Sequence, residues 1–430
     1  MTSADSLKEI ILSNEDYILN QVKSIVPREN VRLPESASKV CVFHGIRRSG
    51  KSFMLFDLFR KRRERAFYVD FEDDRLGEVS IKDLEGIREA FLELRPALAG
   101  KPGVALVLDE IQNVEGWEKF ARRMVEREGA EVFVSGSSSQ VSPAHIHTAL
   151  RGRSWAMEVL PFSFREWLSA KGIAADAGAA ALGSRKPLVK NAFHEYLKSG
   201  GFPETAFVES EFERRRIVQE YLDAMFFRDL VDRFDITNTG LLNALKDKLF
   251  SSFSQKVSLS AFCRQHKDKL PFSKDSAYAY YRHFLDSLLI YEAGILSDSA
   301  YKRARNPSKV YLADAALARR VSSEDSGRLL ENAVYLELRR RGCEVFYFQG
   351  RNECDFVFRL GGRWSALQVA WRLAESNRRR EFEGLAEACA LLGAKAGTFV
   401  SIEEEGQERS SGVLVRNVPA WKWFLEGPWG

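Results

Sequence analysis

The chain has 430 residues, of which 45% are hydrophobic, 29% charged and 12% aromatic. This composition predicts a globular protein with substantial apolar cores and excludes a wholly disordered, collagen-like or disulfide-stapled chain. At about 150 residues per domain, the length predicts about three domains. The net charge is only +4, from 64 basic and 60 acidic residues, so any contact with nucleic acid depends on local basic patches.

The five cysteines are scattered along the chain, and none forms a C-x-x-C pair. This usage is typical of neither a zinc site nor a disulfide framework, and it favours a reducing compartment. The N-terminus lacks a basic region followed by an apolar one, and no run of about 18 apolar residues occurs. We therefore expect a soluble, cytoplasmic protein without a membrane partner.

The first half of the chain has an α/β pattern. Residues 1–34 combine apolar positions at helical spacing with two late prolines, which predicts an N-terminal helical segment. Runs without clean polar alternation predict strands that are buried on both faces of a mainly parallel sheet, here in a domain over residues 35–205. These short apolar runs lie at residues 39–44, 65–71, 104–108, 131–135 and 155–160.

The second half predicts two further domains, over residues 206–318 and 319–430. A small-residue stretch at 173–184 predicts a loop or weak helix before them, and residues 205–250 have helical apolar spacing. Residues 257–294 have the rhythm of a short helix, a turn, a second helix and a strand, which is a winged-helix pattern. The last hundred residues predict a helix followed by three strands, at 328–341, 344–348, 354–360 and 364–370.

A glycine-rich loop follows the first predicted strand. Residues 45–52 read Gly-Ile-Arg-Arg-Ser-Gly-Lys-Ser, which matches G-x-x-x-x-G-K-[ST] between a strand and a helix; the alternative is an ordinary glycine turn. In such a loop the backbone N–H groups and the helix N-terminus bind phosphate, Lys51 reaches the β- and γ-oxygens, and Ser52 ligates Mg²⁺. We therefore expect ATP and Mg²⁺ as cofactors. The expected nucleotide-binding residues are Gly45, Ile46, Arg47, Arg48, Ser49, Gly50, Lys51, Ser52 and Phe53.

Two adjacent acids, Asp109 and Glu110, end the third predicted strand. At the carboxyl end of a buried strand, Asp109 is expected to hold Mg²⁺ and Glu110 to polarise the attacking water. Acid pairs are also common at strand tips, so it is the glycine loop upstream that favours the catalytic interpretation.

Hydroxyl and arginine side chains accompany the next two predicted strands. The fourth strand runs into the serine-rich residues 135–139, where a hydroxyl could sense the γ-phosphate; we take Ser135 as the candidate, although the segment could be a plain loop. Arg153 precedes the last strand and could neutralise γ-phosphate charge, in the same chain or from a neighbouring subunit. The alternative for Arg153 is a solvated basic turn.

These segments together resemble a large family of bacterial and archaeal AAA-type ATPases. The resemblance spans residues 15–205 and rests on GIRRSGKSFML, YVDFEDDRL, LVLDEIQNVEGWEKFARRM, VFVSGSSS and LRGRSWAMEVLPFSFREWL. It implies a P-loop core with a small helical lid, in which Asp109 and Glu110 are the Walker B acids, residues 135–137 are sensor-like and Arg153 is the arginine trigger. Because AAA-type cores often place this arginine on a neighbouring subunit, the resemblance also implies a homo-oligomer.

The second half resembles the domains that usually follow in these proteins, a winged-helix segment and a degenerate restriction-endonuclease-like fold. The resemblance rests on GGFPE, YLDAMFFRDLVDRFDI, KVYLADAAL, GRLLENAVYLELRRRG, ECDFVF and LQVAWRL. In an active nuclease of this fold, acids and a lysine hold Mg²⁺ and activate water, and the corresponding residues here are Glu331, Asp355, Gln368 and Ala370. Gln368 lacks the negative charge and Ala370 lacks the amine, so the resemblance implies a fold retained for binding.

We therefore predict an Mg-dependent, ATP-hydrolysing switch or motor whose C-terminal domains contact double-stranded DNA or a protein. Four basic runs, at 60–65, 214–216, 339–341 and 378–380, support a nucleic-acid partner only weakly, because such runs are mostly solvated helix faces. Two alternatives stay open: a nucleotide-gated scaffold protein with negligible hydrolysis, and a nucleotide-regulated nuclease.

Overall fold

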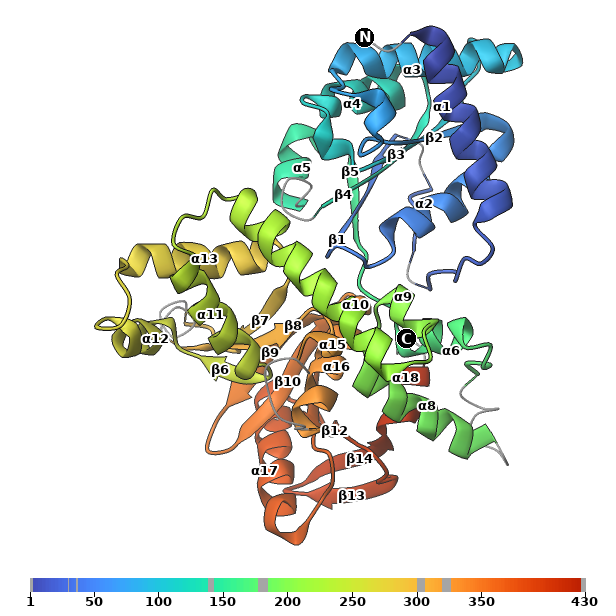
Figure 1. Cartoon of the computed structure of the whole chain (residues 1–430). Helices are drawn as coiled ribbons and strands as arrows, with labels where there is room; N and C mark the ends of the chain where they lie inside the picture. The colour runs from blue at the N-terminus through green and yellow to red at the C-terminus, as the bar shows by residue number, and fades with distance from the viewer. Residues whose placement is uncertain are drawn as a thin grey trace. The chain divides into compact units, whose positions relative to one another are not determined.

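The structure is a computed structural model, and it describes residues 3–29, 31–35, 38–137, 143–176, 185–299, 306–318 and 326–426. The chain packs as two compact units, Met1–Val159 and Leu160–Gly430, and each is described by itself (Figure 1). No helix within these described ranges is long and apolar enough to cross a membrane.

The first unit is built on a five-stranded sheet in the order β2-β3-β4-β1-β5, in which every neighbouring pair is parallel. The strands are β1 (Val40–Gly45), β2 (Ala66–Asp70), β3 (Ala105–Asp109), β4 (Glu131–Ser137) and β5 (Ser154–Glu158). Each one coincides with a predicted strand to within two residues at either end, which confirms the α/β core. Because the strands are parallel, their carboxyl ends share one edge of the sheet, where ligands of open α/β sheets bind.

Successive strand residues pack into two separate cores, as expected for strands buried on both faces. Val40 and Val42 contribute to one core, and Cys41 and Phe43 contribute to the other. The helices of the first core are α1 (Ala4–Asp16), α3 (Ile81–Leu94), α4 (Trp117–Arg127) and α5 (Pro143–Ala149). Those of the second are η1 (Tyr17–Gln21) and α2 (Lys51–Arg60). The helix predicted within residues 1–34 is therefore present, but it is part of this unit rather than a separate segment. Short 3₁₀ turns are η2 (Arg63–Arg65), η3 (Asp74–Leu76), η4 (Pro96–Leu98) and η5 (Ile111–Asn113).

The second unit holds a nine-stranded mixed sheet in the order β13-β14-β12-β11-β10-β9-β7-β8-β6 (Figure 1). Its strands are β6 (Gln255–Val257), β7 (Ile290–Ile295), β8 (Ser308–Leu312), β9 (Glu344–Gln349), β10 (Glu353–Leu360), β11 (Arg363–Val369), β12 (Ala396–Ser401), β13 (Gly406–Ser410) and β14 (Val413–Pro419). Its helices are α6 (Phe164–Ala170), α8 (Arg185–Ser199), α9 (Pro203–Ala206), α10 (Glu211–Ala224), η6 (Met225–Asp232), α11 (Thr239–Ser251), α12 (Leu259–His266), α13 (Lys274–Asp286), α15 (Ala315–Ala318), α16 (Ser326–Arg340), α17 (Glu375–Leu392) and α18 (Ala420–Leu425).

The helices and strands predicted for the second half are present. Helices α12 and α13 precede β7, as predicted for residues 257–294, and α16 precedes β9, β10 and β11. Gly361 and Gly362 join β10 to β11 with φ angles of 56° and 83°, a left-handed conformation that suits glycine. Of the loop or weak helix predicted at 173–184, residues 173–176 are neither helix nor strand, and residues 177–184 lie outside the described part of the chain.

The two compact units group the predicted domains differently from the sequence. Residues 160–205, which the sequence assigns to the ATPase domain, belong to the second unit. There Arg165 in α6 donates a hydrogen bond to the carbonyl oxygen of Leu425 in α18. The predicted domains 206–318 and 319–430 share one sheet, because β7 pairs with β9. Such pairing joins residues far apart in the chain, and composition carries no signal for it.

The GGFPE segment (residues 200–204) packs closely against Phe162 and Asp314 within the second unit. Gly200 has a φ of 75°, and a Cβ there would lie 1.8 Å from Oδ1 of Asp314. A Cβ on Gly201 would lie 2.4 Å from the carbonyl oxygen of Phe162. Asp314 accepts hydrogen bonds from the N–H groups of Gly201 and Ala316, each at 2.8 Å. Close packing therefore accounts for both glycines.

Candidate functional site

The glycine loop leaves the sheet at the carboxyl end of β1 and runs into α2. The backbone of Val159 packs so close to residue 45 that only glycine fits there, because a Cβ on Gly45 would lie 2.3 Å from the carbonyl oxygen of Val159. Arg48 and Gly50 take left-handed conformations, with φ angles of 66° and 95°, that turn the chain into the helix. The N-cap of α2 is Gly50, which has no side chain to cap the helix. The N–H groups of the first turn therefore have no intrahelical acceptor and are available to an anion.

The polar groups of the loop fit a bound phosphate. Lys51 is 5% exposed, and its ammonium donates to the carbonyl oxygens of Gly45 and Ile46 at 3.2 and 3.3 Å. The Ser49 hydroxyl is buried and has no hydrogen-bond partner within the described residues. A buried hydroxyl without a partner costs free energy, which a ligand oxygen at this position would recover. The lysine, the hydroxyl and the open helix N-terminus thus match the needs of a phosphate group.

Two residues outside the glycine loop, Arg28 and Glu72, contact it. Neither contact was predicted from the sequence. Arg28, in the segment that precedes β1, donates to the carbonyl oxygen of Ser49 at 2.9 Å. Arg47 within the loop pairs with Glu72 at 3.7 Å. Phe53, one of the expected nucleotide-binding residues, is 47% exposed on α2. Its large exposed ring beside Ser52 leaves it available to a nucleotide.

Asp109 ends β3 and receives hydrogen bonds from three hydroxyl groups. Tyr68 donates to Oδ2 at 2.8 Å, and Ser135 donates to Oδ1. The Ser52 hydroxyl also bonds to this carboxylate. The structure therefore brings together Ser52, Asp109 and Ser135, as the sequence predicts. Tyr68 was not predicted as a site residue. The only indication in the sequence is its hydroxyl group within the apolar run of β2, two residues before Asp70.

The electrostatics of this carboxylate favour a cation. Burial raises the pKa of Asp109, and the charge of Glu110 raises it further, whereas the three hydroxyl groups lower it. Burial also raises the pKa of Asp70, at the end of β2, to about 6. Burial raises the pKa of Tyr68 well above its usual value, so its phenol stays a hydrogen-bond donor. A divalent cation at this edge would favour the ionised carboxylates.

Glu110 takes a left-handed conformation, with a φ of 50°. This conformation is uncommon for a residue other than glycine and is frequent at functional sites. Its N–H donates to Oδ1 of Asp109 at 3.1 Å and to Oγ of Ser135 at 3.4 Å. Its carboxylate accepts a hydrogen bond from Nε2 of Gln112 at 2.6 Å. Gln112 was not predicted, although it lies two residues further along in the acid-bearing segment.

Arg153 does not reach the glycine loop of its own chain. It precedes β5, and its carbonyl oxygen accepts a hydrogen bond from the N–H of Val40, the first residue of β1, at 2.7 Å. The loop leaves the other end of β1, about 17 Å away at 3.3 Å per residue. The guanidinium of Arg153 pairs with Glu126 at 3.0 Å. Arg153 therefore lies far from the glycine loop of its own chain, and its role as the arginine trigger stays a prediction, which this position favours at a neighbouring subunit.

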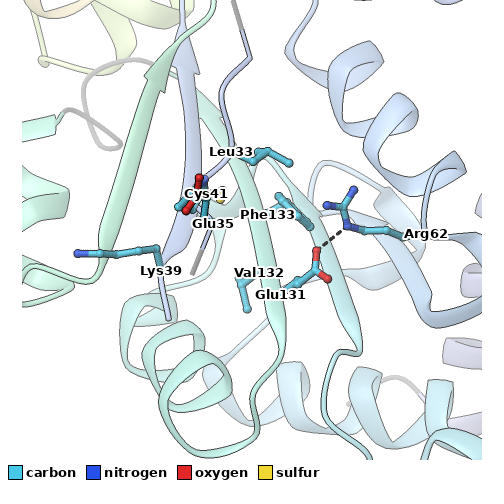
Figure 2. A pocket seen from close by; sticks show the side chains of 9 residues that line it. Leu33, Glu35, Lys39, Cys41, Arg62, Glu131, Val132 and Phe133 are labelled. Carbon is cyan, nitrogen blue, oxygen red and sulfur yellow. Dashed lines mark hydrogen bonds and ion pairs between the residues drawn. The ribbon is translucent and has the colours of Figure 1, made fainter. Parts of the chain in front are cut away.

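A cavity of about 250 Å³ lies at the edge of the first sheet opposite the glycine loop (Figure 2). It is lined at the start of β1 and β4, where Nε of Arg62 pairs with Oε2 of Glu131 at 2.6 Å. The Arg62 guanidinium also lies 4.7 Å from the ring centroid of Phe133. Burial raises the pKa of Cys41 in this cavity to about 12, so its thiol stays protonated. None of the predicted site residues lines this cavity.

In the second unit, three of the positions predicted from the nuclease resemblance, Glu331, Asp355 and Gln368, lie near one another. Glu331 and Asp355 come together, because both contact Nζ of Lys309, at 3.0 and 2.9 Å. Gln368 joins neighbouring elements: its Oε1 accepts from the N–H of Asp355 at 2.9 Å, and its Nε2 donates to Glu381. Among the residues that the structure describes, no three His, Cys, Asp or Glu side chains are arranged to hold a metal ion.

Three family models match the chain. An AAA domain matches residues 37–168, a domain of unknown function (DUF8612) matches residues 190–327, and a second domain of unknown function (DUF4143) matches residues 326–421. The first match contains the glycine loop and both acids, which agrees with the P-loop NTPase fold of the five-stranded sheet. The other two descriptions name neither a winged helix nor a nuclease.

Two solved structures are similar over much of the chain. The Walker-type ATPase PABY2304 of Pyrococcus abyssi is 14% identical with a TM-score of 0.40, covering 69% of this chain and 98% of that chain. The Aeropyrum pernix ORC2 protein is 12% identical with a TM-score of 0.35, covering 77% and 92%. At these values neither likeness carries an argument about function.

Two relatives match along most of their length. An uncharacterized protein of Haemophilus influenzae is 25% identical over 374 residues, which cover 84% of this chain and 90% of that protein. The uncharacterized protein MJ1544 of Methanocaldococcus jannaschii is 32% identical over 433 residues, which cover 97% and 95%. The chain therefore belongs to the family of this archaeal protein, and its N-terminal part is an AAA domain of the P-loop NTPase fold.

Proposed function

We propose that the chain binds Mg-ATP at the glycine loop and hydrolyses it, and that this cycle drives a molecular switch or motor. The observation that carries the proposal is the hydrogen-bonded group of Ser52, Asp109, Ser135 and Glu110 beside the loop. A protein that only binds nucleotide has no need of a second acid held in a left-handed turn.

The role of each side chain follows from the requirements of phosphoryl transfer. Ser52 and Asp109 would hold Mg²⁺, which neutralises charge on the β- and γ-phosphates when it is bound. Lys51 would exchange the loop carbonyls for phosphate oxygens. Glu110, oriented by Gln112, would accept a hydrogen bond from the attacking water and polarise it. The hydroxyl of Ser135 donates to the Asp109 carboxylate and accepts from the backbone N–H of Glu110, and so connects both residues to β4.

Double-stranded DNA is the partner that we propose for the second unit. Strand β8 pairs in antiparallel register with both β6 and β7, and α12 and α13 lie between β6 and β7 in the chain. This order and pairing support the winged-helix prediction. Helix α13 presents Lys274, Tyr278 and Arg282 at i, i+4 and i+8, and all three are exposed. A cationic helix face with one aromatic residue suits the phosphates that border a DNA groove.

A homo-oligomer would complete the catalytic site. The side chain of Arg153 is 46% exposed at the sheet edge opposite the glycine loop. A head-to-tail arrangement brings opposite edges of two subunits together, so this arginine could reach the γ-phosphate of its neighbour. Removal of Arg153 in such an assembly lowers turnover without weakening nucleotide binding.

ATP turnover by the purified chain with Mg²⁺, measured with and without double-stranded DNA, tests the proposal. We expect a rate that DNA raises several-fold and that the Lys51→Ala variant loses. Turnover that is indifferent to DNA would overturn the DNA part and point to a protein partner. Tight ATP binding without any turnover would overturn the hydrolase and favour the nucleotide-gated scaffold.

A further inference from the structure

A buried lysine lies among three carboxylates in the nine-stranded sheet of the second unit. Lys309 in β8 is 3% exposed. Its Nζ lies 3.0 Å from Oε1 of Glu331, 2.9 Å from Oδ1 of Asp355 and 2.7 Å from Oε1 of Glu353. One ammonium group therefore contacts three acids from two other elements, α16 and β10.

The surrounding contacts fix each partner. Tyr311 donates to Oε1 of Glu331 at 3.1 Å, and the N–H of Val369 donates to Oδ2 of Asp355 at 3.0 Å. Lys256, the register partner of Lys309 on β6, binds the second oxygen of Glu353 at 2.7 Å. Burial lowers the pKa of Lys309, but the three carboxylates raise it, and the net effect is a pKa well above its usual value. The ammonium therefore stays charged.

One ammonium serves three acids here, which distinguishes the position from an ordinary ion pair. Glu353 and Asp355 both lie on β10, and their carboxylates converge with that of Glu331 on Nζ of Lys309. The ammonium–oxygen distances exceed the 2.3 to 2.6 Å of calcium–oxygen bonds by less than about 1 Å. A small shift of three carboxylates would suit a divalent ion, but Lys309 already fills the space.

We propose that the Lys309 ammonium is a built-in cation that takes the place of a divalent metal among Glu331, Glu353 and Asp355. It offsets part of the negative charge of these acids, joins the β6–β8 pair to α16 and β10, and closes the second unit to metal-dependent chemistry. This inference does not depend on ATP hydrolysis by the first unit.

Thermal unfolding of the full chain without nucleotide tests the inference, with Ca²⁺ and Mn²⁺ as probes. Lys309→Met keeps the apolar stem but leaves the buried carboxylates without their cation. We expect the unfolding temperature of the second unit to fall by about 5 to 10 °C and millimolar Ca²⁺ or Mn²⁺ to restore at least half of the loss. Wild type should not gain stability in this unit from either cation.

Two further variants separate charge from packing. Lys256→Met removes a lysine that is more exposed and contacts only one of the three acids, so we expect a small loss and no response to cations. Lys309→Met combined with Glu331→Gln removes the lysine together with one of its acid partners and should recover part of the stability without metal. If Lys309→Met alone does not fold, this double variant still allows the inference to be tested.

Three results would overturn the inference. The first is a Lys309→Met variant as stable as wild type in the absence of cations. The second is a destabilised variant that neither a divalent cation nor Glu331→Gln restores, because the role of Lys309 would then be packing alone. The third is a wild-type chain whose second unit binds Mn²⁺ in a manner that Glu331→Gln abolishes.

Discussion

The carboxylate of Asp109 depends on hydroxyl groups from three different elements, and Tyr68 supplies the one that lies outside the glycine loop and the serine-rich strand. A Tyr68→Phe substitution keeps the ring that packs 5.1 Å from Phe56 and removes only this hydrogen bond. We expect the free energy of unfolding to fall by about 1 to 3 kcal/mol, because a buried acceptor loses a donor. Several-fold more Mg²⁺ should be needed for half-maximal turnover.

A magnesium titration of turnover checks this prediction, and Tyr196→Phe is the matched control. Tyr196 is also buried and donates to the carbonyl oxygen of Phe162, but it lies in the second unit. The control should lose stability and keep the wild-type magnesium dependence. Equal magnesium dependence in wild type and Tyr68→Phe would show that the phenol does not position Asp109.

Asp314 gives a pH dependence with a defined sign. Burial raises its pKa from 3.8 to about 6, so the folded protein holds this proton to a higher pH than the unfolded chain. The stabilising contribution is complete below about pH 4 and is lost as the pH rises through about 6, a difference of about 3 kcal/mol. Urea unfolding at pH 4.5 and at pH 7 checks this prediction. Between these two pH values, the free energy of unfolding should decrease less in the Asp314→Asn variant than in wild type. Parallel pH profiles would contradict the assignment.

At the scale of single residues, the sequence predicted the site where a motif fixes the spacing. Lys51, Ser52 and the two acids occupy one edge of the sheet because the glycine loop and the strand ends define their positions. Tyr68 and Lys309 could not be predicted, because their partners are 41 and 46 residues away and no local pattern records the contacts. Arg153 lies at the edge opposite the glycine loop because it precedes its strand, so its role at a neighbouring subunit stays a prediction.

At the scale of elements, helix α13 supplies the test of DNA binding. Replacing Lys274 and Arg282 by Ala removes two exposed cations from one helix face and leaves Ala277 and Phe284, which are buried, untouched. We expect DNA affinity to fall for every sequence and the slope of log affinity against log salt to decrease by about 2. A matched control is Arg215→Ala with Arg216→Ala, two exposed cations on α10. An equal loss in this control would mean that the contact is not specific to α13.

The elements themselves were largely predictable. Each buried strand of the first unit is an apolar run with a polar or glycine-containing segment on either side. The ends of these strands can therefore be predicted from the sequence. The helix now seen as α16 has one apolar face and ends before Gly342, whose φ of 78° suits a helix C-terminus. Strands β12 to β14 and the helices α17 and α18 beyond the nuclease-like motif were not predicted.

At the scale of the whole molecule, the sequence predicted the kinds of structure in the chain but not which of them pack together as one unit. The short parallel pairing of β7 with β9, Gly294 with Phe346 and Ile295 with Tyr347, merges two predicted domains into one sheet. Likewise, the hydrogen bond from the N–H of Gly201 to Asp314 joins residues that are 113 positions apart. It connects the region after the AAA domain to the segment between β8 and α15. Contacts of this range determine what packs as one unit, and they have no signature in local composition.

Glu110→Gln is the decisive variant for ATP hydrolysis by the first unit, in which we propose that Glu110 activates the water. This substitution keeps the size and the hydrogen-bonding capacity of the side chain and removes its charge. Nucleotide affinity and single-turnover hydrolysis should be measured on the same preparations of wild type and variant. We expect ATP affinity within a few-fold of wild type and a hydrolysis rate that is lower by a factor of about 100 or more. An unchanged rate in the variant would contradict the proposed role of Glu110.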